Sequence, residues 1–253
     1  MPSQIAAQMY TLRDFTKTPK DIASTLARVK KIGYDAVQLS ALGKIDPAEL
    51  AKILRNEGLT CCATHVSAER MRDETAAVIE EHNLWGCKFT AVGGFFPKNP
   101  TAKDFLDFAK SFNDIAEKFR GSSVRVGYHN HSHELARYDG KTALQTLLDQ
   151  LSKDVWMEID TYWIQHGGGD PAAWIDKVAG RIPCVHLKDM AITSNREQLM
   201  AEIGEGNLNW PAILTTCKSV GVEWYIIEQD ICQRDPFESL SISLTNVKRM
   251  GLG

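Results

Sequence analysis

The sequence lacks the features that mark a membrane protein or a nucleic-acid-binding protein. It contains 29 Lys and Arg against 32 Asp and Glu, a formal net charge of −3, so no basic excess points to a nucleic-acid partner. No stretch approaches the roughly eighteen consecutive apolar residues of a transmembrane helix, and residues 1–10 do not place an apolar run after a basic segment. We therefore expect a soluble, cytoplasmic protein with no nucleic-acid partner and no membrane partner.

The chain also lacks the cysteine spacings of a disulfide framework or a zinc motif. None of its six cysteines forms a CxxC pair, and a chain of 253 residues can bury a core without covalent cross-links. We expect reduced core residues at Cys61, Cys62, Cys87, Cys184, Cys217 and Cys232. A redox-active Cys61-Cys62 pair is the alternative, although the sequence around it shows nothing that would lower a thiol pKa.

No linker, low-complexity tract or change of composition divides the chain, so we expect one domain over residues 1–253. One pattern repeats instead: a short apolar segment with strand character, a polar turn, and a segment of helical period. Strands are expected at residues 5–10, 35–40, 59–66, 87–92, 124–128, 155–160, 181–187 and 223–229. Helices are expected at residues 19–32, 47–57, 68–85, 103–119, 141–151, 171–179, 210–220 and 236–250. Eight strands alternating with eight helices in about 250 residues predict an α/β fold, a single (β/α)8 TIM barrel.

The most informative segment is residues 126–134, Val-Gly-Tyr-His-Asn-His-Ser-His-Glu. It begins with strand character and ends in three imidazoles, an amide and a carboxylate. Such a cluster at the end of a strand costs desolvation free energy unless its members bind something. The cluster therefore indicates a metal ion or a polar ligand, against the alternative of a surface loop that collected these residues by chance.

Strand alternation predicts where polar side chains point. In a parallel barrel successive residues alternate between the interior and the helix-packed outside, so the more apolar set faces the helices. In strand 155–160 that set is Val155, Met157 and Ile159, which turns Glu158 and Asp160 inward. The same parity puts further inward polar residues near the C-terminal ends of strands: Gln8, Gln38, His65, His129, His186, Lys188 and Glu228. Because such barrels build their sites at that edge, we expect a ligand site there.

Motifs at these strand ends resemble those of a known family. They are Gln8-Met9-Tyr10-Thr11-Leu12-Arg13, Tyr128-His129-Asn130-His131 followed by Glu134, Met157-Glu158-Ile159-Asp160, Gly168-Gly169-Asp170-Pro171, Val185-His186-Leu187-Lys188-Asp189, Gly204-Glu205-Gly206 and Ile227-Glu228-Gln229-Asp230. Over nearly its whole length the chain resembles the xylose isomerase-like TIM barrel family of sugar phosphate isomerases/epimerases. That family includes inosose dehydratases and ketose 3-epimerases, and the endonuclease IV group is a more distant relative.

The resemblance implies one divalent metal ion at the C-terminal edge. Carried over by motif, its ligands are Glu134, Asp160, His186 and Glu228. A mainly oxygen site of this kind suits Mn²⁺, Mg²⁺ or Co²⁺, with Zn²⁺ also possible. Many relatives carry a glutamate where this chain has His129, so the strand-five ligand is Glu134, His129 or His131.

The resemblance also implies roles in catalysis and in substrate binding. A metal-chelated sugar carbonyl acidifies the adjacent C–H, and we expect Glu228 or His129 to transfer that proton while Lys188 holds the oxyanion. Expected substrate contacts are His65, His131, Glu158, Trp163 and His166. The structural alternatives are packing for Trp163, a structural hydrogen bond for His65, and an ion pair with Asp189 for Lys188. His82, in a helical segment, is expected on the surface.

The predicted function is that of a divalent-metal-dependent sugar isomerase/epimerase that abstracts a proton next to the carbonyl of a ketose or related sugar. One alternative is a metal-dependent lyase or dehydratase acting on an inosose or a 3-keto glycoside. A second is a non-catalytic sugar-binding barrel, which would keep the cavity without the full set of metal ligands. A homo-oligomer is possible, and the apolar segment Gly94-Phe95-Phe96-Pro97 is a candidate interface or lid.

Overall fold

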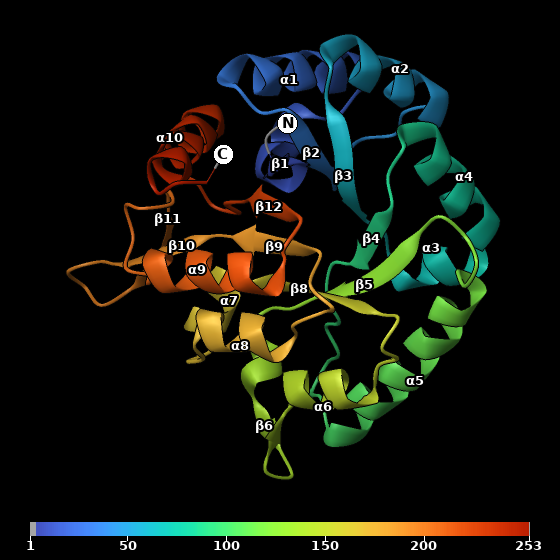
Figure 1. Ribbon diagram of the computed structural model, residues 1–253, viewed down its shortest axis with the longest axis vertical. Coiled ribbons are helices and arrows are strands. Elements are labelled where there is room, and N and C mark those ends of the chain that lie inside the picture. Colours follow the sequence, from blue (N-terminus) through green and yellow to red (C-terminus); the bar gives the residue numbers. More distant parts are fainter. Residues whose placement is uncertain (1–3, 253) are drawn as a thin grey trace.

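The computed structural model describes residues 4–252, and within them eight parallel strands close into a barrel (Figure 1). Around the barrel each strand pairs with the next, and β12 pairs with β1 to close it. The strands are β1 (Ile5–Gln8), β2 (Ala36–Leu39), β3 (Thr60–His65), β4 (Phe89–Val92), β5 (Arg125–His129), β8 (Trp156–Asp160), β9 (Cys184–Leu187) and β12 (Trp224–Ile227). The predicted single (β/α)8 TIM barrel is confirmed.

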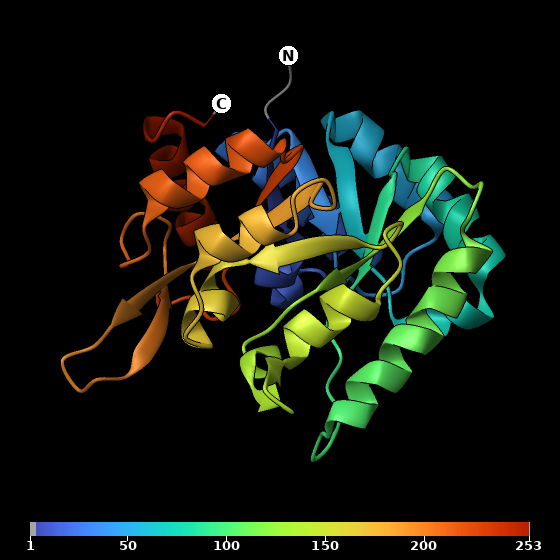
Figure 2. The same ribbon diagram turned by 60° about the horizontal axis from the view of Figure 1, so that its bottom comes forward.

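Helices surround the barrel on its outer face (Figures 1 and 2). They are α1 (Pro19–Ile32), α2 (Pro47–Glu57), α4 (Thr75–Trp85), α5 (Ala102–Lys118), α6 (Ala143–Gln150), α8 (Pro171–Lys177), α9 (Trp210–Val220) and α10 (Pro236–Arg249). The first helix shows why the sequence predicted its bounds. Thr18 and Asp21 form a capping box, Pro19 occupies the first turn, and Gly33 ends the helix at φ 115°.

Two expectations about the segment 68–85 are wrong. The segment forms two helices, α3 (Ala68–Asp73) and α4, because Glu74 leaves helical geometry at φ −124°, ψ 33° and the Thr75 hydroxyl bonds back to the Met71 carbonyl. His82 is fully buried, with Nε2 2.8 Å from Thr64 Oγ1 and Nδ1 2.7 Å from the Val78 carbonyl. It faces the strand layer instead of solvent, and this burial lowers its pKa.

Several short elements were not expected, and most of them follow the C-terminal ends of barrel strands. They are η1 (Met9–Phe15), η2 (His133–Leu135), α7 (Thr161–His166), the hairpin of β6 (Arg137–Tyr138) and β7 (Lys141–Thr142), and the hairpin of β10 (Asp189–Ile192) and β11 (Gln198–Ala201). The β10–β11 hairpin projects from the body of the barrel (Figure 2). These elements are too short to show a hydrophobic period, so the sequence pattern merged them into loops.

The core has two layers, as strand alternation predicts. The larger layer lies between strands and helices and contains Val155, Met157 and Ile159. The smaller layer fills the barrel interior and includes Trp156. Gly127 makes room for that indole, since a Cβ at this glycine would lie 2.3 Å from Trp156. The same alternation directs the polar residues that lie between these apolar residues toward the barrel interior.

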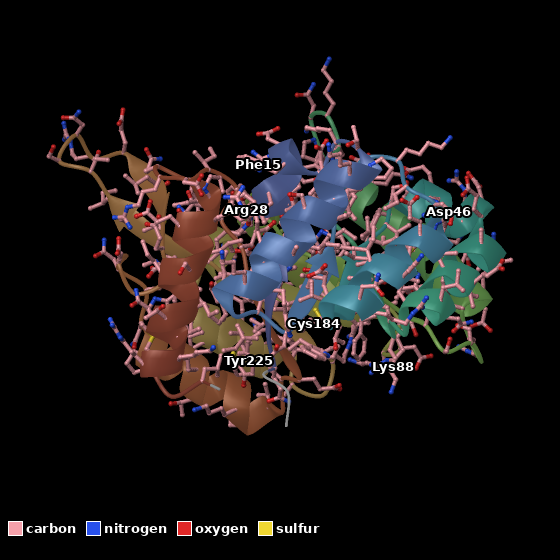
Figure 3. The ribbon with its side chains drawn as sticks, turned by 90° about the horizontal axis from the view of Figure 1, so that it is seen from above. Phe15, Arg28, Asp46, Lys88, Cys184 and Tyr225 are labelled. Atoms are coloured by element: carbon pink, nitrogen blue, oxygen red, sulfur yellow. The ribbon has the colours of Figure 1, made fainter. Side chains whose placement is uncertain are left out.

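The first and last helices also pack against each other. The Arg28 guanidinium lies 3.3 Å from the centroid of the Phe237 ring, and the Phe15 and Phe237 rings meet edge to face at 5.1 Å. Figure 3 shows Phe15 beside Arg28, and it also labels Cys184 and Tyr225, which are both buried. Cys184 belongs to the interior layer, where burial raises its thiol pKa. Among the described helices, none combines the length and apolar character needed to cross a membrane.

Candidate metal centre and substrate cavity

Within residues 4–252, four side chains bring potential metal ligands together at the C-terminal edge of the barrel. His129 ends β5, Asp160 ends β8, His186 lies in β9 and Glu228 follows β12. One donor atom from each of the four lies within 4.8 Å of the others, and all four side chains are buried. They converge because parallel strands end at the same edge of the barrel.

The two histidines are oriented as metal-binding histidines are. His186 Nε2 donates to Gln38 Oε1 at 2.6 Å, and His129 Nδ1 lies 3.4 Å from the Gly93 carbonyl. Their other ring nitrogens face the carboxylates, as in histidines that bind a metal ion. Burial lowers the pKa of His186, but the charges of Glu158 and Glu228 outweigh burial and hold that pKa well above its usual value. His186 Nδ1 lies 3.0 Å from Glu228 Oε2 but has no hydrogen-bond partner among the described residues. His129 Nε2 lies 3.3 Å from Asp160 Oδ2.

These separations fit a bound cation. Ligand atoms about 2.1 Å from an ion lie roughly 3.0–3.4 Å apart in octahedral or tetrahedral geometry. The distances of 3.0 Å between His186 Nδ1 and Glu228 Oε2 and 3.3 Å between His129 Nε2 and Asp160 Oδ2 match that spacing. The distance between His186 Nδ1 and Asp160 Oδ2, 3.7 Å, is slightly wider. The buried, unpaired Nδ1 of His186 is a further indication, since burying a polar atom without a partner costs free energy. The group is therefore able to hold a metal ion.

The expected ligand Glu134 lies outside this group. Its carboxylate accepts hydrogen bonds from Tyr128 Oη at 2.7 Å and from the His131 backbone N–H at 2.9 Å. Tyr128 points to the helix layer, so the chain after β5 carries Glu134 to the outer side of the strand. Burial raises the pKa of Glu134. Of the three candidates for the strand-five ligand, His129 is the one whose donor atom lies in the same group as those of Asp160, His186 and Glu228.

Glu158 also lies elsewhere than expected. It was predicted to contact substrate, but it is fully buried and does not line the cavity described below, and Gln38 Nε2 donates to its Oε1 at 2.9 Å. Its Oε2 lies 2.7 Å from His65 Nε2. Burial would raise the pKa of Glu158, but the nearby His186 and His65 outweigh burial and hold that pKa well below its usual range. Glu158 thus supports the site from below, together with Gln38.

Lys188 contacts three carboxylates. Its Nζ lies 3.0 Å from Asp160 Oδ2, 2.8 Å from Glu228 Oε2 and 2.9 Å from Asp230 Oδ2. Burial lowers the pKa of Lys188, and the charges of these carboxylates more than offset burial, so the pKa stays well above its usual value. The alternative ion pair with Asp189 does not form. Asp189 instead accepts hydrogen bonds from the Gly204, Gly206 and Leu208 backbone N–H groups and from Trp210 Nε1.

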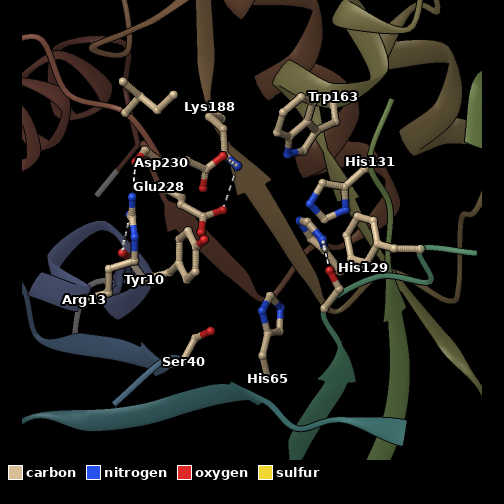
Figure 4. Close-up of a pocket in the computed structure, with 13 residues that line it drawn as sticks. Tyr10, Arg13, Ser40, His65, His129, His131, Trp163, Lys188, Glu228 and Asp230 are labelled. Carbon is tan, nitrogen blue, oxygen red and sulfur yellow. Dashed lines mark hydrogen bonds and ion pairs between the residues drawn. The ribbon is translucent and has the colours of Figure 1, made fainter. Parts of the chain in front are cut away.

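Two of the four donors, His129 and Glu228, line a cavity of about 490 Å³ (Figure 4). Its lining residues are Tyr10, Arg13, Ser40, His65, Gly93, Phe96, His129, His131, Trp163, Lys188, Glu228, Asp230 and Ile231. Of the predicted substrate contacts, His65, His131 and Trp163 line this cavity. His166 does not, and its ring packs 5.5 Å from those of Tyr162 and Trp163.

Two cavity residues have polar atoms that are available to a ligand. Trp163 Nε1 and His131 Nδ1 are buried and have no hydrogen-bond partner within residues 4–252. Burial, with the neighbouring His129 and Lys188, lowers the pKa of His131 to about 2, so this imidazole is neutral. A neutral imidazole and an indole N–H suit the hydroxyl groups of a polar ligand.

Sequence reasoning missed four polar lining residues, Tyr10, Arg13, Ser40 and Asp230. Tyr10 and Arg13 lie in η1, which follows β1, and Arg13 Nη2 donates to the Asp230 carbonyl at 2.9 Å. Both ends of that contact belong to the motifs recognised above, so the motifs could have indicated them. A short 3-10 turn has no simple side-chain period, and the directions of its side chains therefore could not be predicted.

The fold and the donor group define a (β/α)8 barrel with a candidate metal centre at its C-terminal edge. A family model described as xylose isomerase-like TIM barrel matches residues 26–239. The chain therefore belongs to the xylose isomerase-like TIM barrel family, as its motifs predicted.

Comparison with individual proteins agrees with this family. The chain is 24% identical over 160 residues to the rhizopine catabolism protein MocC of Rhizobium meliloti, covering 56% of this chain and 49% of MocC. It is 24% identical over 195 residues to an inosose dehydratase of Clostridium tetani, covering 66% of this chain and 62% of that protein. Each match thus spans less than two thirds of the relative's length.

Solved structures share the fold over almost the full chain. A sugar phosphate isomerase/epimerase from Parabacteroides distasonis matches with a TM-score of 0.82 and 21% identity, covering 98% of this chain and 94% of that one. The IOLI protein, solved with a binding zinc atom, matches with a TM-score of 0.71 and 13% identity, covering 97% of this chain and 96% of that one. At these identities the likeness is one of fold.

Proposed function

We propose that this protein is a divalent-metal-dependent sugar isomerase or epimerase that moves a proton next to a substrate carbonyl. The observation that carries the proposal is the group of four donors, His129, Asp160, His186 and Glu228, of which His129 and Glu228 line a cavity of about 490 Å³. Polar and aromatic side chains around that cavity suit a sugar, and relatives of the same fold include a sugar phosphate isomerase/epimerase.

The donor set bears on which ion is bound. With His129 in place of Glu134, the set contains two imidazoles and two carboxylates, whereas the expected set had three carboxylates and one imidazole. Imidazole favours Mn²⁺, Co²⁺ or Zn²⁺ over Mg²⁺, which prefers oxygen ligands. When bound, such an ion would supply Lewis-acid polarisation of the sugar carbonyl.

We assign proton transfer to groups that face the cavity but do not belong to the donor set. Glu228 and His129, the expected proton-transfer groups, are both donors. Asp230 lines the cavity beside them, and its Oδ2 lies 2.9 Å from Lys188 Nζ. In this proposal the Asp230 carboxylate accepts the proton adjacent to the carbonyl, and the Lys188 ammonium stabilises the negative oxygen that develops.

The remaining cavity residues would position the sugar. The unpaired Trp163 Nε1 donates to a hydroxyl, the neutral His131 accepts from or donates to another, and the Trp163 ring covers an apolar sugar face. Ser40 and Tyr10 add hydroxyls on the opposite wall in Figure 4. Positioning of this kind lowers the entropy cost of bringing the C–H to its base.

Elimination from an inosose or a 3-keto glycoside is the second candidate. The specific observation in its favour is that the strand-five side of the cavity presents His129 and His131, while Glu134 is directed away. An epimerase that uses one carboxylate on each face of the sugar would lack its second carboxylate there. Elimination needs one base and one acid, and adjacent Asp230 and Lys188 can supply both.

The test measures the step that the candidate reactions share, which is removal of the proton next to the carbonyl. Protein loaded with Mn²⁺, Co²⁺ or Zn²⁺ is incubated in D₂O with ketohexoses, inososes and 3-keto glycosides, and deuterium next to the carbonyl is measured by NMR. We expect exchange that depends on the ion and is lost in Glu228→Gln and His186→Ala. The matched control is Glu223→Gln, the same substitution at the exposed opposite end of the β12 region.

The products separate the candidate functions. A rearranged or inverted sugar identifies isomerisation or epimerisation, and release of water or an alcohol identifies elimination. If no divalent ion binds the wild-type protein even after reconstitution, the proposed chemistry is wrong and the non-catalytic sugar-binding barrel replaces it.

A further inference from the structure

Lys188 shares its contacts with the donor group. Its Nζ lies 3.0 Å from Asp160 Oδ2 and 2.8 Å from Glu228 Oε2. The same two oxygens face the histidine nitrogens, at 3.3 Å from His129 Nε2 and 3.0 Å from His186 Nδ1. An ion bound by the four donors would therefore draw on the two oxygens that the ammonium group contacts.

We propose that Lys188 is the resident cation of this site, which balances the charges of Asp160 and Glu228 and thereby weakens binding of the divalent ion. Binding of the ion shifts the ammonium group from these two carboxylates to Asp230 alone. This inference rests on the proposed function, in which the donor group binds a divalent ion.

Charge is the physical reason for the competition. Two carboxylates beside two neutral imidazoles match the two positive charges of a divalent ion, so the charge of Lys188 must be matched by another carboxylate, Asp230, once the ion is bound. The side chain of Lys188 is only 1% exposed, and like charges at short range in a buried site are poorly screened by water. The divalent ion must therefore overcome this repulsion or displace the ammonium group.

Asp230 is suited to receive the displaced ammonium group. Its Oδ2 is already 2.9 Å from Lys188 Nζ, and its side chain is 19% exposed on the cavity side. Its backbone carbonyl is held by Arg13 Nη2 at 2.9 Å, which fixes the position of this residue. The Trp163 ring, 5.4 Å from Nζ, provides a second favourable surface for the cation. Loading the ion would thus leave Lys188 on the cavity side, where the proposed reaction needs it.

The alternative is that Lys188 is structural support that holds Asp160 and Glu228 in place for the ion. The two roles predict opposite changes in ion affinity when Lys188 is replaced by a neutral residue. A resident cation weakens ion binding, so its neutral replacement binds the ion more tightly, whereas structural support strengthens ion binding, so its removal weakens it.

The experiment measures Mn²⁺ dissociation constants by calorimetry on chelator-treated protein. Lys188→Met, which keeps length and removes charge, is expected to bind at least about tenfold more tightly than wild type. Lys110→Met, on the exposed face of α5, is the matched control and is expected to match wild type. Asp230→Asn is expected to weaken binding several-fold, and to weaken it less when Lys188→Met is also present, because the two residues act as a pair.

A second measurement needs no variant of the site. Wild-type protein is acetylated with and without Mn²⁺, and modification of each lysine is located by mass spectrometry. Lys188 is expected to become several-fold more reactive with Mn²⁺, while Lys110 serves as an unchanged internal reference. This readout decides the matter if Lys188→Met does not fold.

The outcomes distinguish this inference from the proposed function. Equal or weaker Mn²⁺ binding by Lys188→Met, or Lys188 reactivity that does not rise with Mn²⁺, overturns the resident-cation role and leaves the metal site intact. Absence of Mn²⁺ binding in both wild type and Lys188→Met overturns the proposed function itself. Binding by Lys188→Met but not by wild type supports competition between Lys188 and the ion, and it overturns the proposed metal-dependent function of the wild-type protein.

Discussion

Gln38 Oε1 lies 2.6 Å from His186 Nε2, and this contact decides which ring nitrogen of His186 faces the candidate metal centre. Gln38 Oε1 also accepts from Gln8 Nε2 at 2.7 Å, while Gln38 Nε2 donates to Glu158. The amide orientation is therefore determined, and His186 Nε2 must be a donor. Nδ1 is left facing Glu228 and Asp160, where it would supply its lone pair to a bound ion.

Replacing Gln38 should weaken ion binding without touching a ligand. In Gln38→Leu we expect Mn²⁺ affinity to fall by about 10- to 100-fold, since the ring of His186 loses the partner that orients it. Calorimetric titration provides the measurement, and Gln145→Leu, on the surface of α6, is the control. Unchanged Mn²⁺ affinity in a folded Gln38→Leu protein would show that packing alone orients His186.

His129 and Glu134 should respond differently to substitution. His129→Ala is expected to lose the bound ion, measured by elemental analysis after reconstitution, because it removes a donor atom. Glu134→Gln is expected to keep the ion but to lower the free energy of unfolding by about 1–3 kcal/mol, since its contacts with Tyr128 and the His131 N–H change. Loss of the ion in Glu134→Gln alone would restore Glu134 as the strand-five ligand.

Substitutions of Trp163 and His166 should distinguish a residue that contacts substrate from one that only packs beside the cavity. Trp163→Phe keeps an aromatic ring and removes the buried, unpaired Nε1–H, so we expect KM for the sugar to rise roughly tenfold with a smaller change in kcat. His166→Ala lies outside the cavity lining and is expected to leave KM within about twofold of wild type. Steady-state kinetics on the substrate found by deuterium exchange provide the measurement. A larger rise in KM for His166→Ala than for Trp163→Phe would contradict this placement.

His82 should make stability fall in mild acid. Burial lowers its folded-state pKa below the unfolded value near 6.5, so below that pH the unfolded chain binds a proton that the folded protein does not. The free energy of unfolding should therefore decrease as pH falls from 7 toward 5, by up to about 1.4 kcal/mol per pH unit from this residue. His82→Gln, which can still bond Thr64, should show a shallower slope in urea titrations at pH 7, 6 and 5. Equal slopes would exclude His82 as the cause.

Much of the fold followed from local sequence. Thr18, Pro19 and Gly33 determined the bounds of α1, because caps and proline act within a few residues. Alternation along β8 predicted that Val155, Met157 and Ile159 face the helices, which turned Asp160 inward. The same parity predicted the inward side of His186 and Lys188. These features depend on residues close together in the chain, so the sequence alone determined them.

Only the tertiary structure decided which polar residues act together. How the chain leaves β5 put His129, and not Glu134, beside the other candidate donors. The contacts of Glu158 depended on Gln38 and His65 from other strands. The contacts of Lys188 with Asp160, Glu228 and Asp230 join residues up to 42 positions apart. Donor geometry and charge balance depend on distances between strand ends, and those distances exist only after the barrel has closed.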